Sequence, residues 1–152
     1  MARTTTGAHL SSNRDKVLRI ALEWEGTPYL HQGSVKGVAA DCLGFIRGVR
    51  AEYVGEDVKD RPNYSPSWGE VDRDERLLTA AATYLAPVDY PRWKPGDVLV
   101  FRVKFAKSAK HCASAIDDRT MLHAVGNRAV IETGIGAWSS RIAGVFKFPG
   151  VI

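Results

Sequence analysis

The sequence predicts an α+β fold in which N-terminal helices pack on a C-terminal antiparallel sheet. Apolar residues recur at helical spacing in two segments of the first half, residues 14–25 and 42–53. After Pro95 the pattern changes to short apolar runs separated by turn residues, which is typical of strands. Helices followed by a run of strands favour this class, and 152 residues suffice for one domain with a substantial core.

The first helix is expected from Arg14 to Glu25. Ser12 or Asn13 can cap its N-terminus, and Gly26 is placed to end it. Its buried stripe is expected to consist of Val17, Ile20, Ala21 and Trp24. A further helix is expected from Asp72 to Leu85, with Leu77, Leu78, Ala81 and Leu85 facing inward.

The second half predicts a sheet of about five strands. The expected strands are residues 97–103, 110–116, 120–125, 129–132 and 141–148. Residues 1–13 are expected to form a flexible N-terminal arm ahead of one domain, residues 14–152.

Cys42 is the candidate nucleophile. It shares a helical face with Phe45, Ile46, Val49 and Tyr53, so it falls in the first turn of the second helix. The unpaired N–H groups and the positive end of the helix dipole stabilise a thiolate there. The competing interpretation is that Cys42 is an ordinary buried cysteine, because free cysteine is among the most buried residue types.

His111 and His123 are candidates for a base and a residue that orients it. They flank a polar turn, Asp117-Asp118-Arg119, between two predicted strands. A three-residue hairpin loop would place His111 opposite Val125, and a turn centred on Asp117 would place it opposite His123. In both registers the two histidines share one face of the sheet, as neighbours or diagonal neighbours. A Cys–His–X triad needs such a pair beside the nucleophile.

The other cysteine, Cys112, is expected to be a small buried hydrophobe. Side chains alternate along a strand, so Cys112 points away from the face of His111, which argues against a disulfide with Cys42. A zinc site built from Cys42, His111, Cys112 and His123 is an alternative that the same alternation disfavours.

Composition and charge restrict the class of partner only weakly. The net charge of +4 suits an anionic partner such as a bacterial wall, but no cluster of basic residues interleaved with aromatics indicates direct nucleic-acid binding. No segment reaches transmembrane length, so membrane insertion is not expected. The first thirteen residues lack the apolar core of a secretory signal.

Several motifs together resemble the NlpC-type, papain-like cell-wall peptidases. They are Gly26-Thr27-Pro28-Tyr29, Gln32-Gly33, Asp41-Cys42-Leu43-Gly44 and Lys94-Pro95-Gly96-Asp97-Val98-Leu99-Val100-Phe101. Within that family, Leu30-His31-Gln32-Gly33, residues 41–49 and the closing residues 141–149 are similar to the branch carried by tailed phages and gene-transfer agents. Against the general family pattern, residues 54–93 form an insertion before the sheet.

The resemblance implies a hydrolase that cleaves peptidoglycan stem peptides, between D-glutamate and a diamino acid, without a cofactor. It implies that Cys42 attacks the amide, that His111 is the base and that His123 orients His111. Tyr29 would line the site and help hold the oxyanion, and Asp41 would bind the free amine of the stem peptide. Asp41 could equally cap the helix, and Tyr29 could equally be a packed aromatic.

The same resemblance predicts where the protein works. Lacking a signal, it would be made in the bacterial cytoplasm, carried in the tail of a phage-like particle beside tail-tip proteins, and used in the periplasm of the target cell. Two departures, Gln32 in place of a usual Gly and Leu43 in place of a usual Ser, favour an alternative, a catalytically silent component kept for docking. An acyltransferase of the same fold is a further alternative.

Overall fold

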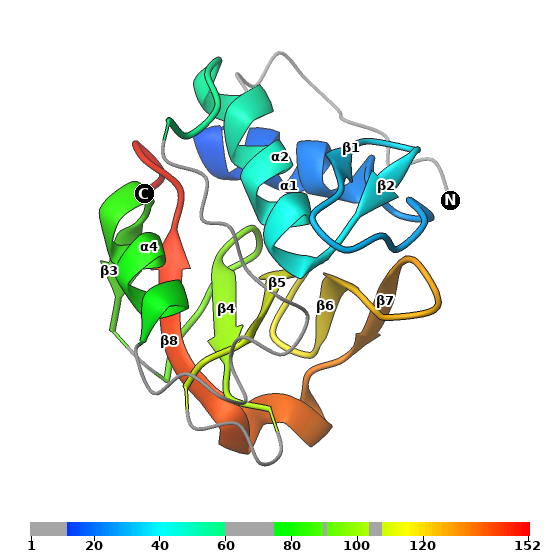
Figure 1. Ribbon diagram of the computed structural model, residues 1–152. Coiled ribbons are helices and arrows are strands. Elements are labelled where there is room, and N and C mark those ends of the chain that lie inside the picture. The colour runs from blue at the N-terminus through cyan, green and yellow to red at the C-terminus, as the bar shows by residue number, and fades with distance from the viewer. Residues whose placement is uncertain (1–11, 60–74, 90, 104–107) are drawn as a thin grey trace, which may run out of the picture.

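A computed structural model describes residues 12–59, 75–89, 91–103 and 108–152. Its helices are α1 (Asn13–Leu22), α2 (Cys42–Val54), α4 (Arg76–Tyr84) and a 3-10 helix, η1 (Gly136–Arg141). Its strands are β1 (Ser34–Val35), β2 (Ala39–Ala40), β3 (Ala86–Val88), β4 (Val98–Phe101), β5 (His111–Ala115), β6 (Thr120–Ala124), β7 (Val130–Gly134) and β8 (Ile142–Lys147). The helices α1 and α2 lie together over the sheet, and α4 lies beside β3 and β8 (Figure 1).

Six strands form one antiparallel sheet in the order β3-β8-β4-β5-β6-β7. The α+β class and the five expected strands are therefore confirmed. The sixth strand, β3, was not expected because it is short and contains Pro87. Its place at the edge of the sheet explains why proline is tolerated, since an edge strand has one side with no ladder to complete.

The two faces of the sheet bury different clusters. Helices α1 and α2 cover one face, where Phe45 and Val49 pack against a set that includes Cys112 and Leu122. The other face buries Leu99, Phe101, Met121 and Val145, with Trp138 of η1 packed against them. The strands between these clusters are buried on both sides, so β5 is a rigid support for the residues at its ends.

The first helix begins as expected and ends earlier. Ser12 is its cap, with Oγ accepting from the N–H of Asp15 at 3.1 Å. The helix ends at Leu22 and not at Glu25, because the chain already turns there toward Gly26, whose φ is +86°. All four residues of the expected stripe are buried.

Helix α4 occupies part of the predicted insertion. It runs from Arg76 to Tyr84, and Leu77, Ala81 and Leu85 are buried as expected, with Leu78 partly buried. The expected start at Asp72 lies outside the described residues, as do residues 1–11 of the expected arm and residues 60–74 of the insertion.

The hairpin of β5 and β6 has the register of a three-residue loop. Ser114 pairs with Leu122 and Ala115 with Met121, and the N–H of Ile116 donates to the carbonyl of Thr120. His111 and His123 are therefore diagonal neighbours on one face, which is the first of the two predicted registers.

Candidate active site

Cys42 is the first residue of α2, as its sequence position predicts. Its Sγ lies 3.8 Å from the carbonyl oxygen of Lys110, which directly precedes β5. The start of the helix therefore abuts the start of the strand that carries His111. This contact brings a thiol from the helical layer to the end of the sheet at which β5 begins.

The carboxylate of Asp41 fixes the start of α2. One oxygen accepts from the N–H of Gly44 at 2.7 Å, and the other accepts from the N–H of Gln32 at 2.7 Å. Asp41 is only 2% exposed, so both bonds lie in a low-dielectric setting. Asp41 is therefore the helix cap and also fastens the preceding loop to the nucleophile. The Nδ1 of His31 lies 3.8 Å from the same carboxylate.

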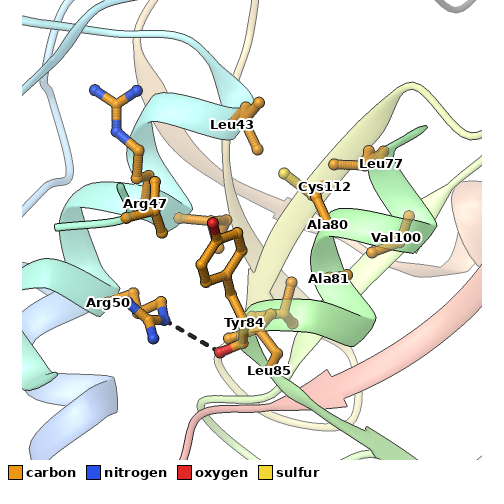
Figure 2. Close-up of a pocket in the computed structure, with 13 residues that line it drawn as sticks. Leu43, Arg47, Arg50, Leu77, Ala80, Ala81, Tyr84, Leu85, Val100 and Cys112 are labelled. Carbon is orange, nitrogen blue, oxygen red and sulfur yellow. Dashed lines mark hydrogen bonds between the residues drawn. The ribbon is translucent and has the colours of Figure 1, made fainter. Parts of the chain in front are cut away.

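The two departures from the usual family motif do not intrude on the nucleophile. Gln32 adopts a φ of +62°, the left-handed region that favours glycine, yet its N–H still reaches Asp41. Leu43 turns away from the cleft and lines a small apolar pocket of about 80 Å³ between α2 and α4 (Figure 2). Neither side chain blocks access to Cys42.

His111 and His123 form a hydrogen-bonded pair. The Nε2 of His111 lies 2.8 Å from the Nδ1 of His123, and the Nε2 of His123 lies 2.8 Å from the Oγ1 of Thr133 on β7. Because Nε2 of His111 is engaged by His123, its Nδ1 is the nitrogen available to Cys42. The candidate base and the candidate orienting residue are therefore in direct hydrogen-bond contact, as a triad requires.

Trp138 of η1 packs against both histidines. Its ring centroid lies 5.2 Å from that of His111 at a tilt of 31°, and 5.6 Å from that of His123 in an edge arrangement. The face of an indole ring attracts a neighbouring cation, so Trp138 favours a positive charge on the His111 ring. Trp138 therefore holds both rings from the side that faces away from the helices.

Cys112 is buried and points to the opposite face from His111, as alternation predicts. Both cysteines are free thiols. The face of Cys112 is nevertheless the one on which α2 packs, so its Sγ lies 3.2 Å from the carbonyl oxygen of Cys42. Figure 2 shows Cys112 beneath Leu43 at the wall of the apolar pocket. Alternation correctly separates Cys112 from His111 but does not separate it from Cys42.

A cleft of about 300 Å³ opens at this junction. It is lined by Tyr29, His31, Asp41, Cys42, Val103, Lys110, His111, His123, Ala124, Val125, Gly126 and Trp138. All five predicted site residues, Tyr29, Asp41, Cys42, His111 and His123, lie in this one cleft. The structure therefore brings together residues from the loop before β1, the start of α2 and two strands.

Tyr29 faces the cleft from the loop before β1. Its N–H donates to the carbonyl of Arg128, and its backbone bridges to Ala40. The pKa of Tyr29 is raised by burial first and then by the negative charges of Cys42 and Asp41. Tyr29 therefore keeps its proton and is a hydrogen-bond donor at working pH.

Two further groups lower the pKa of Cys42 well below its usual range, against the opposing effect of burial. The larger effect is a hydrogen bond from the Cys112 thiol, and the second is the hydrogen bond and positive charge of His111. The pKa of Cys112 is raised, first by its interaction with the Cys42 side chain and then by burial. Cys42 lines the cleft and Cys112 is buried, so Cys42 is the candidate reactive thiol.

We therefore expect iodoacetamide to alkylate Cys42 faster than Cys112, and the reaction at Cys42 to persist well below pH 8. Peptide mapping by mass spectrometry after timed labelling at pH 6 to 9 measures both rates in one sample. Faster labelling of Cys112, or a rate at Cys42 that follows the titration of a free thiol, would contradict the assignment.

His123 is neutral at working pH. Burial, and then the positive charge of His111, lower its pKa from the ordinary 6.5 to about 4. Because the unfolded chain binds this proton more tightly, the stabilisation from neutral His123 is fully present above pH 6.5 and is lost as pH falls toward 4. We expect this one group to remove about 3 kcal/mol of unfolding free energy over that window.

Urea denaturation of the wild type and of His123→Gln at pH 7 and pH 4.5 measures this contribution. The variant should lose less stability on acidification than the wild type. Equal losses in the two proteins would place the acid sensitivity elsewhere.

Three residues of the cleft network were not expected from the sequence. Thr133 was missed because the strand predicted over residues 129–132 ends at Glu132, whereas β7 continues for two more residues, to Gly134. Trp138 was missed because a 3-10 helix has no sequence periodicity to detect. His31 lay within a recognised motif, but only the packing against Asp41 shows that it lines the cleft.

Within the described residues, no group of three or more His, Cys, Asp or Glu side chains is arranged to hold a metal ion. In the disfavoured alternative of a zinc site at Cys42, His111, Cys112 and His123, His111 and Cys112 lie on opposite faces of the sheet. No described helix combines the length and apolar character that crossing a membrane requires.

The family model described as the NlpC/P60 family matches residues 26–146 of this sequence. The chain belongs to the NlpC/P60 family. The matched range contains all five predicted site residues and all of the six-stranded sheet except Lys147, the last residue of β8, so the papain-like fold and the NlpC-type family are confirmed. The branch carried by phages and gene-transfer agents stays a prediction.

Solved NlpC/P60 structures share this fold. The chain is similar to the NlpC/p60 domain of the peptidoglycan hydrolase SagA, with a TM-score of 0.61, 18% identity, and coverage of 88% of this chain and 97% of that one. It is also similar to an NlpC/P60 family protein from Bacillus cereus, with a TM-score of 0.62, 21% identity, and coverage of 96% and 43%.

A third similar structure is NlpC1 from Trichomonas vaginalis, with a TM-score of 0.64, 11% identity, and coverage of 97% and 48%. This NlpC/P60 chain therefore spans nearly all of the SagA domain but under half of the other two proteins. No curated protein matched it.

Proposed function

We propose that this protein is a cysteine endopeptidase of peptidoglycan stem peptides. NlpC/P60 proteins are typically cysteine peptidases that act on peptidoglycan. The observation that carries the proposal is the alignment in one cleft of a thiol at a helix start and two hydrogen-bonded histidines. The proposed residues are Cys42 as nucleophile, His111 as base and His123 as the residue that orients His111.

In the first step, the Cys42 thiolate attacks the carbonyl carbon of the scissile amide, with its proton on Nδ1 of His111. The carbonyl oxygen becomes an oxyanion that accepts from N–H groups at the start of α2 and from the hydroxyl of Tyr29. His111 then donates its proton to the leaving amine as the C–N bond breaks. The product is a thioester on Cys42 and a free amine.

In the second step, His111 accepts a proton from water, and the hydroxide attacks the thioester. The C–S bond breaks, the thiolate returns and the peptide acid leaves. If an amine replaced water, the same thioester would give a new amide, which is the acyltransferase alternative.

The proposed bond joins D-glutamate to a diamino acid, by resemblance to the family. Asp41 is the proposed partner of the stem peptide's free amine, because it is the carboxylate that lines the cleft. Asp41 already accepts two backbone N–H bonds, so the amine would share the carboxylate with them. The cap and the binding role are compatible.

Incubation with defined stem peptides, followed by mass analysis, tests the proposal. We expect one cut at the D-glutamyl bond. His123→Ala should retain a low rate, and His123→Asn should recover part of the loss, because an amide oxygen can accept from His111. Wild-type rates in His123→Ala would remove His123 from the site.

The same incubation separates the alternative functions. A product joined to an added amine would favour the acyltransferase, and no product would favour the silent docking component.

We further propose that the enzyme is carried in the tail of a phage-like particle, beside tail-tip proteins, and opens the wall for DNA entry. The support is the resemblance of residues 30–33, 41–49 and 141–149 to that branch. A few copies held at a tip would act at high effective concentration on nearby wall. Proteomics of purified particles, with the free lysate fraction as control, tests this. Recovery only in the free fraction would favour a lysis enzyme.

A further inference from the structure

The side chain of His123 has both ring nitrogens engaged, and the second partner is Thr133. Nδ1 lies 2.8 Å from Nε2 of His111, and Nε2 lies 2.8 Å from Oγ1 of Thr133. His123 is 3% exposed, and both contacts are part-buried. The directly opposed residue on β7 is Ile131, which offers no polar atom, and Thr133 reaches the ring from the diagonal position.

These two hydrogen bonds depend on each other. The pKa of His123 is about 4, so the ring is neutral at working pH and carries one proton. One nitrogen therefore donates and the other accepts. Whether Nε2 donates to the hydroxyl of Thr133 or accepts from it therefore decides whether Nδ1 donates to His111 or accepts from it.

Catalysis needs one of the two arrangements. When His111 holds the proton of Cys42, both of its nitrogens carry hydrogen, so its Nε2–H must donate to His123. The Nδ1 of His123 must then be bare and its proton must lie on Nε2. That proton points at the hydroxyl oxygen of Thr133, which has lone pairs to accept it.

We propose that Thr133 is a positioning residue that selects the tautomer of His123 able to accept a hydrogen bond from His111. The inference rests on the proposed function, in which His111 is the base. The chain of hydrogen bonds runs from His111 to His123 to Thr133. It ends in a hydroxyl and not in a carboxylate, so it stabilises the imidazolium without adding a charge to the site.

Removing the hydroxyl reverses the preference. In Thr133→Val, which keeps the shape of the side chain, an Nε2–H on His123 would be buried without an acceptor. His123 would favour the tautomer with its proton on Nδ1, which opposes the imidazolium of His111. An unsatisfied buried donor of this kind shifts such an equilibrium on the order of tenfold.

The test uses two readouts that need no substrate. Long-range proton–nitrogen NMR of the histidine-labelled full chain identifies the tautomer of His123, and the pH dependence of Cys42 alkylation reports the thiolate. We expect the wild type to carry the His123 proton on Nε2. Thr133→Val should move it to Nδ1 and slow alkylation near pH 6 by about tenfold. Thr133→Ser should restore both values.

The control is Thr83→Val, which deletes the hydroxyl that donates to the carbonyl of Thr79 within α4, away from the cleft. It should leave both readouts unchanged. A wild-type His123 with its proton on Nδ1 would overturn the proposal without any variant, even if Thr133→Val failed to fold. A folded Thr133→Val with the wild-type tautomer and alkylation profile would also overturn it.

The readouts also separate this inference from the function on which it rests. If stem peptides are not cleaved but the tautomer and the thiol profile change as expected, the proposed substrate is wrong and the role of Thr133 stands. If peptides are cleaved and neither readout changes, Thr133 is only a structural residue.

Discussion

Turnover of stem peptides is expected to disappear in Cys42→Ala and in His111→Ala. Each variant removes one half of the pair proposed to form the thioester, and the described residues that line the cleft include no second thiol. Loss of a residue that acts in such a unit reduces turnover by roughly four to six orders of magnitude. Because the two groups act together, the double variant should be no slower than either single variant.

Steady-state rates with a defined stem peptide measure these losses, and thermal unfolding verifies that each variant is folded. Cys112→Ala is the matched cysteine control. It deletes a sulfur that contacts the carbonyl oxygen of Cys42 and helps to lower the pKa of the Cys42 thiol. Because Cys112 does not line the cleft, turnover should persist, but the pH at which it is half-maximal should rise. Activity in Cys42→Ala at the level of Cys112→Ala would exclude the proposed mechanism.

Gly44→Ala is expected to destabilise the fold although it lies in a helix. Replacing glycine by alanine in a helix interior normally stabilises by about 1 kcal/mol. At this position a Cβ would overlap the carbonyl oxygen of Gly33, a backbone atom that cannot rotate away. Separating the helix from that loop would also strain the hydrogen bond from the N–H of Gln32 to Asp41. The steric cost of the overlap exceeds the gain from the helix propensity of alanine, and we expect the unfolding free energy to fall by about 3 kcal/mol.

For a chain of this length, such a loss lowers the melting temperature by roughly 6–12 °C. Gly136→Ala is the control, because a Cβ there meets no atom within 4 Å. Its melting temperature should stay close to that of the wild type. Equal stability of the two variants would show that α2 can retreat from the loop without loss.

The sequence predicts the parts of the site that follow a local pattern. Cys42 lies at a helix start because the apolar spacing fixes the helix. The histidines share a face because, in both possible registers, an odd-numbered residue of one strand lies opposite an odd-numbered residue of the other. The choice between registers was left open, since it depends on how the Asp117 turn closes. That closure is set by the bond from Ile116 to Thr120 and by the side chain of Asp117.

What the sequence does not predict depends on contacts between distant segments. The approach of Cys112 to Cys42 follows from how deeply α2 settles on β5, which no periodicity encodes. The stacking of Trp138 on the histidines depends on the path of η1 between β7 and β8. Thr133 needed only one more residue of strand, so its omission is an error of boundary and not of principle.

The thiol and its base are carried by different layers of the molecule. Cys42 belongs to the helical layer and His111 to the sheet, and they meet only where α2 rests on β5. A chain whose helices and strands have formed separately would therefore hold an ordinary thiol and an ordinary imidazole. Cys42 and His111 come into contact only when the two layers pack together, so the alkylation rate of Cys42 reports that packing. Measured during refolding, this rate would show when the helices pack on the sheet.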